Sequence, residues 1–221
     1  MASLLADVRL QSSTERVTPI DHVPGAYREL GELVAARRRS TGLSVIGVAS
    51  ASRHDGKTTT ATRLAATLAR ARDVRVLLVE ADVRRPSIAR RLHLRHGPGL
   101  LDAIRHAGLT LDQITHPCRP LRANVITAGR RWRSSYEALG SPRLGALLKA
   151  ARRQYDYVIL DAPAVDAVPD FRVISCRADG VFFVVAADRT PRRAVEDAVD
   201  VLDPAKLLGF VFHGALPTRA W

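Results

Sequence analysis

A chain of 221 residues is long enough to bury one substantial core, and it lies within the size range of a single α/β domain. Hydrophobic residues make up 47% of it and aromatic residues only 5%, which suits helices and sheets filled by aliphatic side chains and not an aromatic-rich binding module. No uncharged apolar stretch approaches the roughly 18 residues of a membrane-spanning helix, and the N-terminus lacks a signal-peptide pattern. We therefore expect a cytoplasmic protein.

The formal net charge of +12 is almost entirely arginine, because only three of the 34 basic residues are lysines. Arginine clusters such as residues 37–39 and 152–153 could attract nucleic acid or an anionic membrane surface. They are scattered along the chain and lack interleaved aromatic residues, so we interpret them as solvated helix faces and expect no specific nucleic-acid partner. Cys118 and Cys176 are too few for a zinc motif, and we expect both to be reduced and inert.

The chain begins with a polar segment that has no sustained period and ends at Pro24-Gly25. This pattern predicts a flexible leader over residues 1–25, followed by one P-loop nucleotide-binding domain over residues 26–221. Helical spacings and short apolar runs then alternate. They predict helices over residues 26–39, 57–72, 100–106, 142–153 and 191–202, and strands over residues 44–50, 75–81, 124–128, 157–161, 180–187 and 208–213.

Apolar strands separated by helices indicate an α/β fold of three layers, in which helices flank a mostly parallel central sheet. Helical crossovers are the usual connection between parallel neighbours. Ligands of such sheets bind at the carboxyl ends of the strands, so functional residues are expected there.

A phosphate-binding pattern follows the first of these predicted strands. Residues 51–58 (ASRHDGKT) occupy the register of G-x-x-x-x-G-K-[ST], although Ala51 replaces the first glycine. Gly56 lets the backbone approach a phosphate, Lys57 offers a point charge, and Thr58 offers a hydroxyl to Mg²⁺. The expected nucleotide contacts in the loop are Ser52, Arg53, His54, Asp55, Gly56, Lys57, Thr58 and Thr59.

Acidic residues end two other predicted strands. Glu80 and Asp82 follow the apolar run of residues 76–79, and Asp161 follows residues 158–160. Both strands are expected to end near the phosphate loop, where a carboxylate can hold a magnesium shell or orient an attacking group. The three signals together predict a site for ATP and Mg²⁺.

Longer segments carry a more specific pattern: residues 27–30 (YREL), the phosphate loop, residues 79–86 (VEADVRRP) and residues 155–163 (YDYVILDAP). Together they resemble the CpsD/CapB family of bacterial tyrosine kinases of capsule and exopolysaccharide synthesis. The resemblance implies a protein that binds Mg-ATP and phosphorylates tyrosine on a protein substrate in trans. It also implies work at the inner face of the cell membrane, beside a membrane-embedded polysaccharide co-polymerase.

The resemblance also assigns roles to the site residues. Lys57 and Arg84 would stabilise phosphoryl charge, and Glu80 would receive the proton of the tyrosine hydroxyl. The catalytic set is thus Lys57, Glu80, Asp82 and Arg84. The magnesium ion would be served by Thr58, Asp82 and Asp161.

Several positions differ from the family pattern. Arg53 and His54 stand where the family has Pro-Gly, and Glu80 replaces an aspartate, which moves the carboxylate by one methylene group. His213 replaces an asparagine that commonly contacts adenine in related ATPases; it could contact the base or be a core residue. The ParA and MinD ATPases of the same wider group carry an extra lysine at the position of Ser52, so this serine favours the kinase branch.

Assembly and substrate signals of the family are incomplete. Of its N-terminal ring-assembly pattern only Arg28 remains, which leaves homo-oligomer formation open, and its C-terminal tyrosine cluster is absent from this sequence. Tyr155 and Tyr157 are expected to pack toward one face of their strand. Tyr27 and Tyr136 are expected to be the more accessible tyrosines.

Three functions remain open on the sequence alone. The first is an ATP-dependent protein-tyrosine kinase. The second is a catalytically weak, ATP-switched adaptor of polysaccharide assembly, which the replacements at Arg53, His54 and Glu80 and the missing tyrosine cluster suggest. The third is an ATPase of the ParA/MinD kind that uses water as the acceptor.

Overall fold

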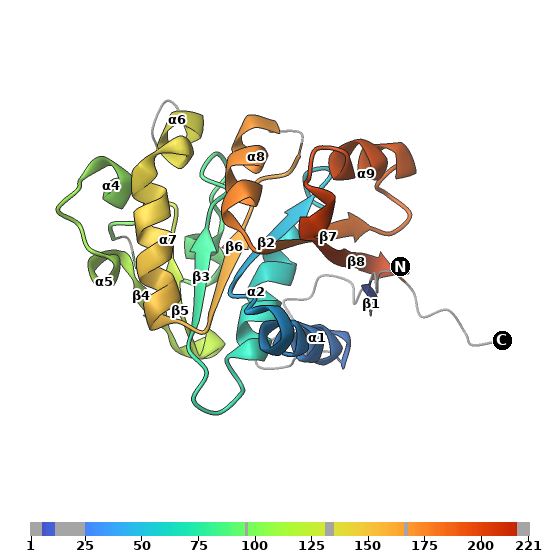
Figure 1. The fold of residues 1–221 in the computed structure, drawn as a ribbon, viewed down its shortest axis with the longest axis horizontal. Coiled ribbons are helices and arrows are strands. Elements are labelled where there is room, and N and C mark those ends of the chain that lie inside the picture. The colour runs from blue at the N-terminus through green and yellow to red at the C-terminus, as the bar shows by residue number, and fades with distance from the viewer. Residues whose placement is uncertain (1–5, 12–24, 96, 131–134, 166–167, 216–221) are drawn as a thin grey trace.

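The structure is a computed structural model that describes residues 6–11, 25–95, 97–130, 135–165 and 168–215, and its centre is an eight-stranded sheet (Figure 1). The strand order is β1-β8-β7-β2-β6-β3-β5-β4, and all neighbours are parallel except β4 and β5. The strands are β1 (Ala6–Gln11), β2 (Val45–Ser50), β3 (Val76–Glu80), β4 (His116–Cys118), β5 (Ala123–Ile126), β6 (Tyr157–Asp161), β7 (Gly180–Ala186) and β8 (Leu207–Ala215).

Helices cover both faces of this sheet. The helices are α1 (Gly25–Thr41), α2 (Lys57–Leu68), α3 (Ile88–Arg91), α4 (Leu100–Arg105), α5 (Leu111–Ile114), α6 (Ser135–Gly140), α7 (Pro142–Gln154), α8 (Val168–Arg177) and α9 (Arg192–Val199). One apolar cluster joins α1, α2 and α3 to the sheet, and a second joins α4 to α9 to its other face. The predicted three-layer α/β fold is thereby confirmed.

Continuous burial explains why the central strands read as unbroken apolar runs. Every residue of β2, β3, β6 and β7 is buried, as expected for parallel strands that helices cover on both sides. The chain leaves β2 toward β3 on one side, whereas β7 and β8 lie on the other side. The end of β2 is therefore a point where the winding direction changes, the usual ligand position in such sheets.

The N-terminal part of the chain differs from the prediction of a flexible leader. Residues 6–11 form the edge strand β1, which pairs in parallel with β8 from Ala6 opposite Gly209 to Gln11 opposite Ala215. The sequence of this segment alternates, with Val8 and Leu10 separated by Arg9, but three such residues are too short a pattern to distinguish from chance. The sheet therefore extends into the segment that was assigned to the leader.

Several short elements were not predicted, among them α3, α5, α6 and β4. The longest of the elements that were not predicted is α8, whose second residue is Pro169. This omission matters because α8 carries Asp170, a buried acid beside the candidate site.

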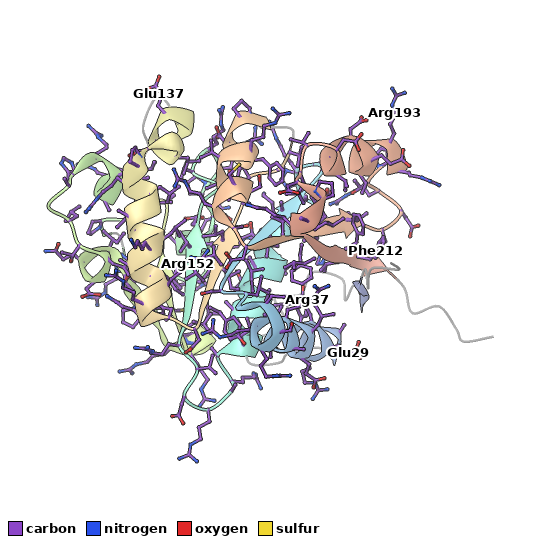
Figure 2. The ribbon with its side chains drawn as sticks, in the orientation of Figure 1. Glu29, Arg37, Glu137, Arg152, Arg193 and Phe212 are labelled. Carbon is purple, nitrogen blue, oxygen red and sulfur yellow. The ribbon has the colours of Figure 1, made fainter. Side chains whose placement is uncertain are left out.

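Charged side chains lie mainly on the outer faces of the helices. Figure 2 shows Glu29, Glu137 and Arg193 pointing away from the ribbon, and all three are exposed. Arg152 instead pairs with Asp179 at 2.6 Å. Within the described residues, no helix combines the length and the apolar character that crossing a bilayer requires.

Candidate active site

The phosphate loop joins the end of β2 to the first residue of α2, and one glycine shapes it. Gly56 has a φ of +97°, and a Cβ added there would lie 2.7 Å from ring atoms of His213. Both the left-handed backbone and the close approach exclude other residues. His213, on β8, therefore packs against the loop, and its ring also lines the pocket above the loop.

Asp55 braces the loop from inside. Its carboxylate is buried, accepts the backbone N–H of Ser52 at 3.0 Å and accepts the hydroxyl of Thr190 at 2.9 Å. An acid whose oxygens face the protein cannot also face a phosphate. The structure thus gives the Asp55 side chain a supporting position, so a nucleotide contact from this residue would have to come from its backbone N–H.

Arg53 and His54 form the exposed tip of the loop. His54 has a φ of +64°, and its carbonyl oxygen accepts a hydrogen bond from the guanidinium of Arg189. Both side chains are exposed and line the rim of the pocket. The bulky pair therefore stands at the edge of the site and leaves the loop interior to Asp55.

An ion pair links the loop to the end of β3. The Lys57 ammonium lies 3.0 Å from Oδ2 of Asp82, and the two side chains are only 12% and 10% exposed. Asp82 is held in place because its backbone N–H donates to the carbonyl of Asp161 at 2.9 Å. The register that sets Glu80 opposite Asp161 in β3 and β6 thus carries Asp82 to the phosphate loop.

Asp161 lies beneath this pair and is 1% exposed. Burial raises its pKa to about 7, although the charge of Lys57 and a hydrogen bond with the Thr58 side chain oppose the shift. Oδ1 of Asp161 has no hydrogen-bond partner among the described residues. A buried carboxylate oxygen without a partner costs free energy, and a bound cation would remove that cost.

The donors around Asp161 fit a magnesium ion. Hard oxygen ligands are available from Thr58, Asp82 and Asp161, and Mg²⁺ in phosphate sites commonly uses one or two carboxylates together with phosphate and water oxygens. Within the described ranges no group of three or more His, Cys, Asp or Glu residues could hold a metal alone.

Glu80 is placed differently from the expected proton acceptor. One carboxylate oxygen accepts the backbone N–H groups of Ser87 and Ile88, the latter at 2.6 Å, and the other accepts that of Ala128 at 3.0 Å. The side chain is 1% exposed. These contacts tie β3 to the start of α3 and to the end of β5, which contradicts the expected role of Glu80 as the base.

Arg84 has a buried partner that the sequence did not indicate. Its guanidinium makes two hydrogen bonds to the carboxylate of Asp170, one of them at 3.1 Å. Asp170 is 1% exposed, whereas the Arg84 side chain is 51% exposed and lines the pocket. The hydrogen bond to Asp170 raises the pKa of Arg84, so this cation remains charged and is held by α8.

The pocket above the loop has a volume of about 550 Å³. Seven basic side chains line it: Arg53, Lys57, Arg84, Arg85, Arg90, Arg91 and Arg189. Asp82 is the single acidic residue among the described lining residues. Such a cavity favours a polyanion, and its position at a helix N-terminus suits phosphate groups.

The tyrosines correct one expectation. Tyr27 is fully buried and its hydroxyl lies 3.4 Å from that of Thr60, so it is not accessible. Tyr155 and Tyr157 are buried as expected, but they belong to opposite apolar clusters because Tyr155 ends α7 and precedes the strand. The side chain of Tyr136 lies outside the described residues.

The sequence is similar to a family model and to several known proteins. The family model for ATPase MipZ matches residues 44–186. The chain is 34% identical over 179 residues to the succinoglycan biosynthesis transport protein ExoP of Rhizobium meliloti, a match of 76% of this chain and 22% of ExoP. It is 30% identical over 169 residues to the tyrosine-protein kinase YwqD of Bacillus subtilis, a match of 76% of this chain and 70% of YwqD. This chain therefore spans less than a quarter of ExoP.

Solved structures share the fold. The chimerical protein CapA2B2 superimposes with a TM-score of 0.83 at 22% identity, covering 96% of this chain and 95% of that chain. The septum site-determining protein MinD of Pyrococcus horikoshii, complexed with Mg-ADP, superimposes with a TM-score of 0.64 at 18% identity, covering 76% and 69%. At these identities the likeness shows the fold alone.

The position of Glu80 leads to a stability prediction. Glu80→Asp withdraws the carboxylate from three buried N–H groups, so we expect the free energy of unfolding in urea to fall by about 2 kcal/mol. Glu29→Asp, on the exposed face of α1, is the matched control and should change it by less than about 0.5 kcal/mol. Full stability combined with a loss of activity in Glu80→Asp would contradict the bracing role.

The position of Asp161 leads to a pH prediction. Since its pKa is raised in the folded protein, the ionised side chain destabilises the fold as pH rises from about 4 to 7. Asp161→Asn should therefore unfold at higher urea than the unaltered protein at pH 8.5 without metal or nucleotide, by on the order of 2 kcal/mol. The difference should shrink at pH 5.5. An equal difference at both pH values would show that the carboxyl does not titrate in this range.

Proposed function

Because the chain belongs to the CpsD/EpsB type of bacterial tyrosine-protein kinases, within the MinD/ParA-like P-loop ATPases, we propose that it binds Mg-ATP and transfers the γ-phosphoryl group to tyrosine of another protein. The observation that carries the proposal is the convergence of Lys57 and Asp82 on one pocket at the start of α2, with the buried carboxyl of Asp161 near the Lys57 charge. Phosphoryl transfer depends mainly on positioning and charge, and these groups can supply both.

Nucleotide binding would exchange one partner of Lys57 for another. The ammonium is paired with Asp82 at 3.0 Å, and arriving phosphates would compete for it. Backbone N–H groups at the start of α2 would bind the same phosphates. Further contacts would come from Ser52, Arg53, His54, Gly56, Thr58, Thr59 and His213, whereas Asp55 holds the loop in shape.

The metal would be held by the Thr58 hydroxyl and by Asp161, with Asp82 beside them. When bound, Mg²⁺ neutralises charge on the β- and γ-phosphates. The unpartnered Oδ1 of Asp161 supports this assignment.

Asp82 is the residue that we assign to the acceptor proton. Glu80 is fully occupied by backbone donors, and Asp82 is the acid that lines the pocket among the described residues. Release of Lys57 to the phosphates would free Oδ2 to accept the proton of the tyrosine hydroxyl. The tyrosine oxygen then bonds to the γ-phosphorus, the bond to the bridging oxygen breaks, and ADP leaves.

Arg84 would stabilise charge on the transferred group. Its partner Asp170 fixes the guanidinium at the edge of the pocket, where half of the side chain stays exposed. A preorganised cation costs little reorganisation during the reaction.

The acceptor would belong to another polypeptide. Tyr27, Tyr155 and Tyr157 are all buried, which supports a substrate in trans. Membership of the family suggests that the substrate, or the protein that holds it at the membrane, would be a membrane-embedded polysaccharide co-polymerase. The chain would then work at the inner face of the membrane through that partner.

A ParA/MinD-like ATPase is the second candidate, favoured by the family-model match to ATPase MipZ over residues 44–186. In that case water would replace tyrosine as the acceptor. An ATP-switched adaptor would bind Mg-ATP without turnover.

A radiolabel experiment separates these functions. With [γ-³²P]ATP, Mg²⁺ and copolymers of tyrosine with glutamate or with lysine, we expect label in phosphotyrosine. Lys57→Ala should reduce the rate on the order of 100-fold or more, because it removes a charge that faces the phosphates. Lys149→Ala, an exposed lysine on α7, is the matched control and should retain the rate. Free phosphate without phosphotyrosine would favour the ATPase, and bound nucleotide without turnover would favour the adaptor; both contradict the kinase.

A further inference from the structure

A second cavity opens beside the phosphate pocket. It has a volume of about 1160 Å³ and is lined by residues from the ranges 86–95 and 97–98 and from the end of β5. Pro86, Ser87 and Arg90 line both cavities, so the two adjoin. We call this second cavity the acceptor groove.

The groove presents positive charge. Arg90, Arg95 and Arg130 line it with exposed side chains. Its two acids, Glu80 and Asp102, are buried and face inward. Asp102 accepts the backbone N–H groups of Gly99 at 2.9 Å and Arg130 at 3.1 Å, and Glu80 accepts three others.

Apolar walls accompany the arginines. Pro86, Leu94, Pro98 and Leu109 line the same groove, and Leu94 and Leu109 are partly exposed. Apolar surface between charged groups fits a polypeptide, whose side chains alternate in character, better than a uniformly polar carbohydrate. Positive charge at the entrance favours acidic partners by attraction at a distance.

We propose that the acceptor groove binds an acidic segment of the protein substrate and leads its tyrosine to the phosphate pocket. The proposal rests on the proposed kinase function for the fate of the tyrosine. The binding step itself can be measured without nucleotide or turnover.

The test uses the whole chain and a fluorescein-labelled peptide of about 12 residues, rich in glutamate with a central phenylalanine in place of tyrosine. Fluorescence anisotropy should show binding that weakens as salt rises. Binding to the double variant Arg95→Glu/Arg130→Glu should be at least tenfold weaker, and a matched glutamine peptide should bind at least tenfold more weakly to the unaltered protein.

Arg70→Glu/Arg72→Glu is the control with the same change of net charge, because both side chains are exposed in the turn between α2 and β3 and neither lines the groove. It should change the dissociation constant less than twofold, and thermal unfolding should show that all variants remain folded. Equal loss of affinity in Arg70→Glu/Arg72→Glu would show that the effect comes from net charge and would contradict the proposed groove. Equal affinity for the glutamine peptide, or for an anionic oligosaccharide with the same arginine dependence, would overturn the acidic-peptide assignment. If the peptide binds as expected but the radiolabel experiment gives no phosphotyrosine, the proposed kinase function is wrong and the proposed peptide binding by the groove still holds.

Discussion

The ion pair between Lys57 and Asp82 is the interaction on which the site depends. Its two groups lie 3.0 Å apart with little exposure, and the buried carboxyl of Asp161 lies beneath them. A cation in this position needs a counter-charge, which Asp82 supplies. On the proposed function, phosphates would compete for Lys57, and nucleotide binding would require mainly an exchange of partners.

The register of the sheet positions the residues of the site. Asp161 pairs with Val48 of β2 on one side and with Glu80 of β3 on the other, so the phosphate loop and both strand ends meet at one edge. Backbone N–H groups of residues 81 and 82 donate to the Asp161 carbonyl. Glu80 then fixes the chain that follows β3 through three backbone donors. The bracing acid Glu80 and the acid that we propose as the proton acceptor, Asp82, therefore lie two residues apart at the same strand end.

Local pattern was enough to predict the central strands, the three-layer fold and the glycine-lysine-threonine corner of the loop. The local sequence pattern was not enough to predict contacts between residues that are far apart in the chain. The donor Ala128 lies 48 residues from Glu80, and Asp170 lies 86 residues from Arg84, so no spacing in the sequence pointed to either pair. The expectation that Tyr27 is accessible is wrong for the same reason, because Tyr27 is buried in the apolar cluster that joins α1 and α2 to the sheet. These positions are set by tertiary packing, which a window of neighbouring residues does not contain.

The chain resembles both kinases and ATPases in its fold, and the fold alone does not decide between them. Whether a tyrosine or water accepts the phosphoryl group would depend on the surface around the proposed phosphate site. The central claim concerns that site, and diffraction from crystals grown with Mn²⁺ and ADP tests it most directly. We expect the anomalous peak of manganese beside the Thr58 hydroxyl and the Asp161 carboxylate, with the Lys57 ammonium moved from Asp82 to a phosphate oxygen. A peak elsewhere, or an intact Lys57–Asp82 pair with ADP bound, would contradict the account.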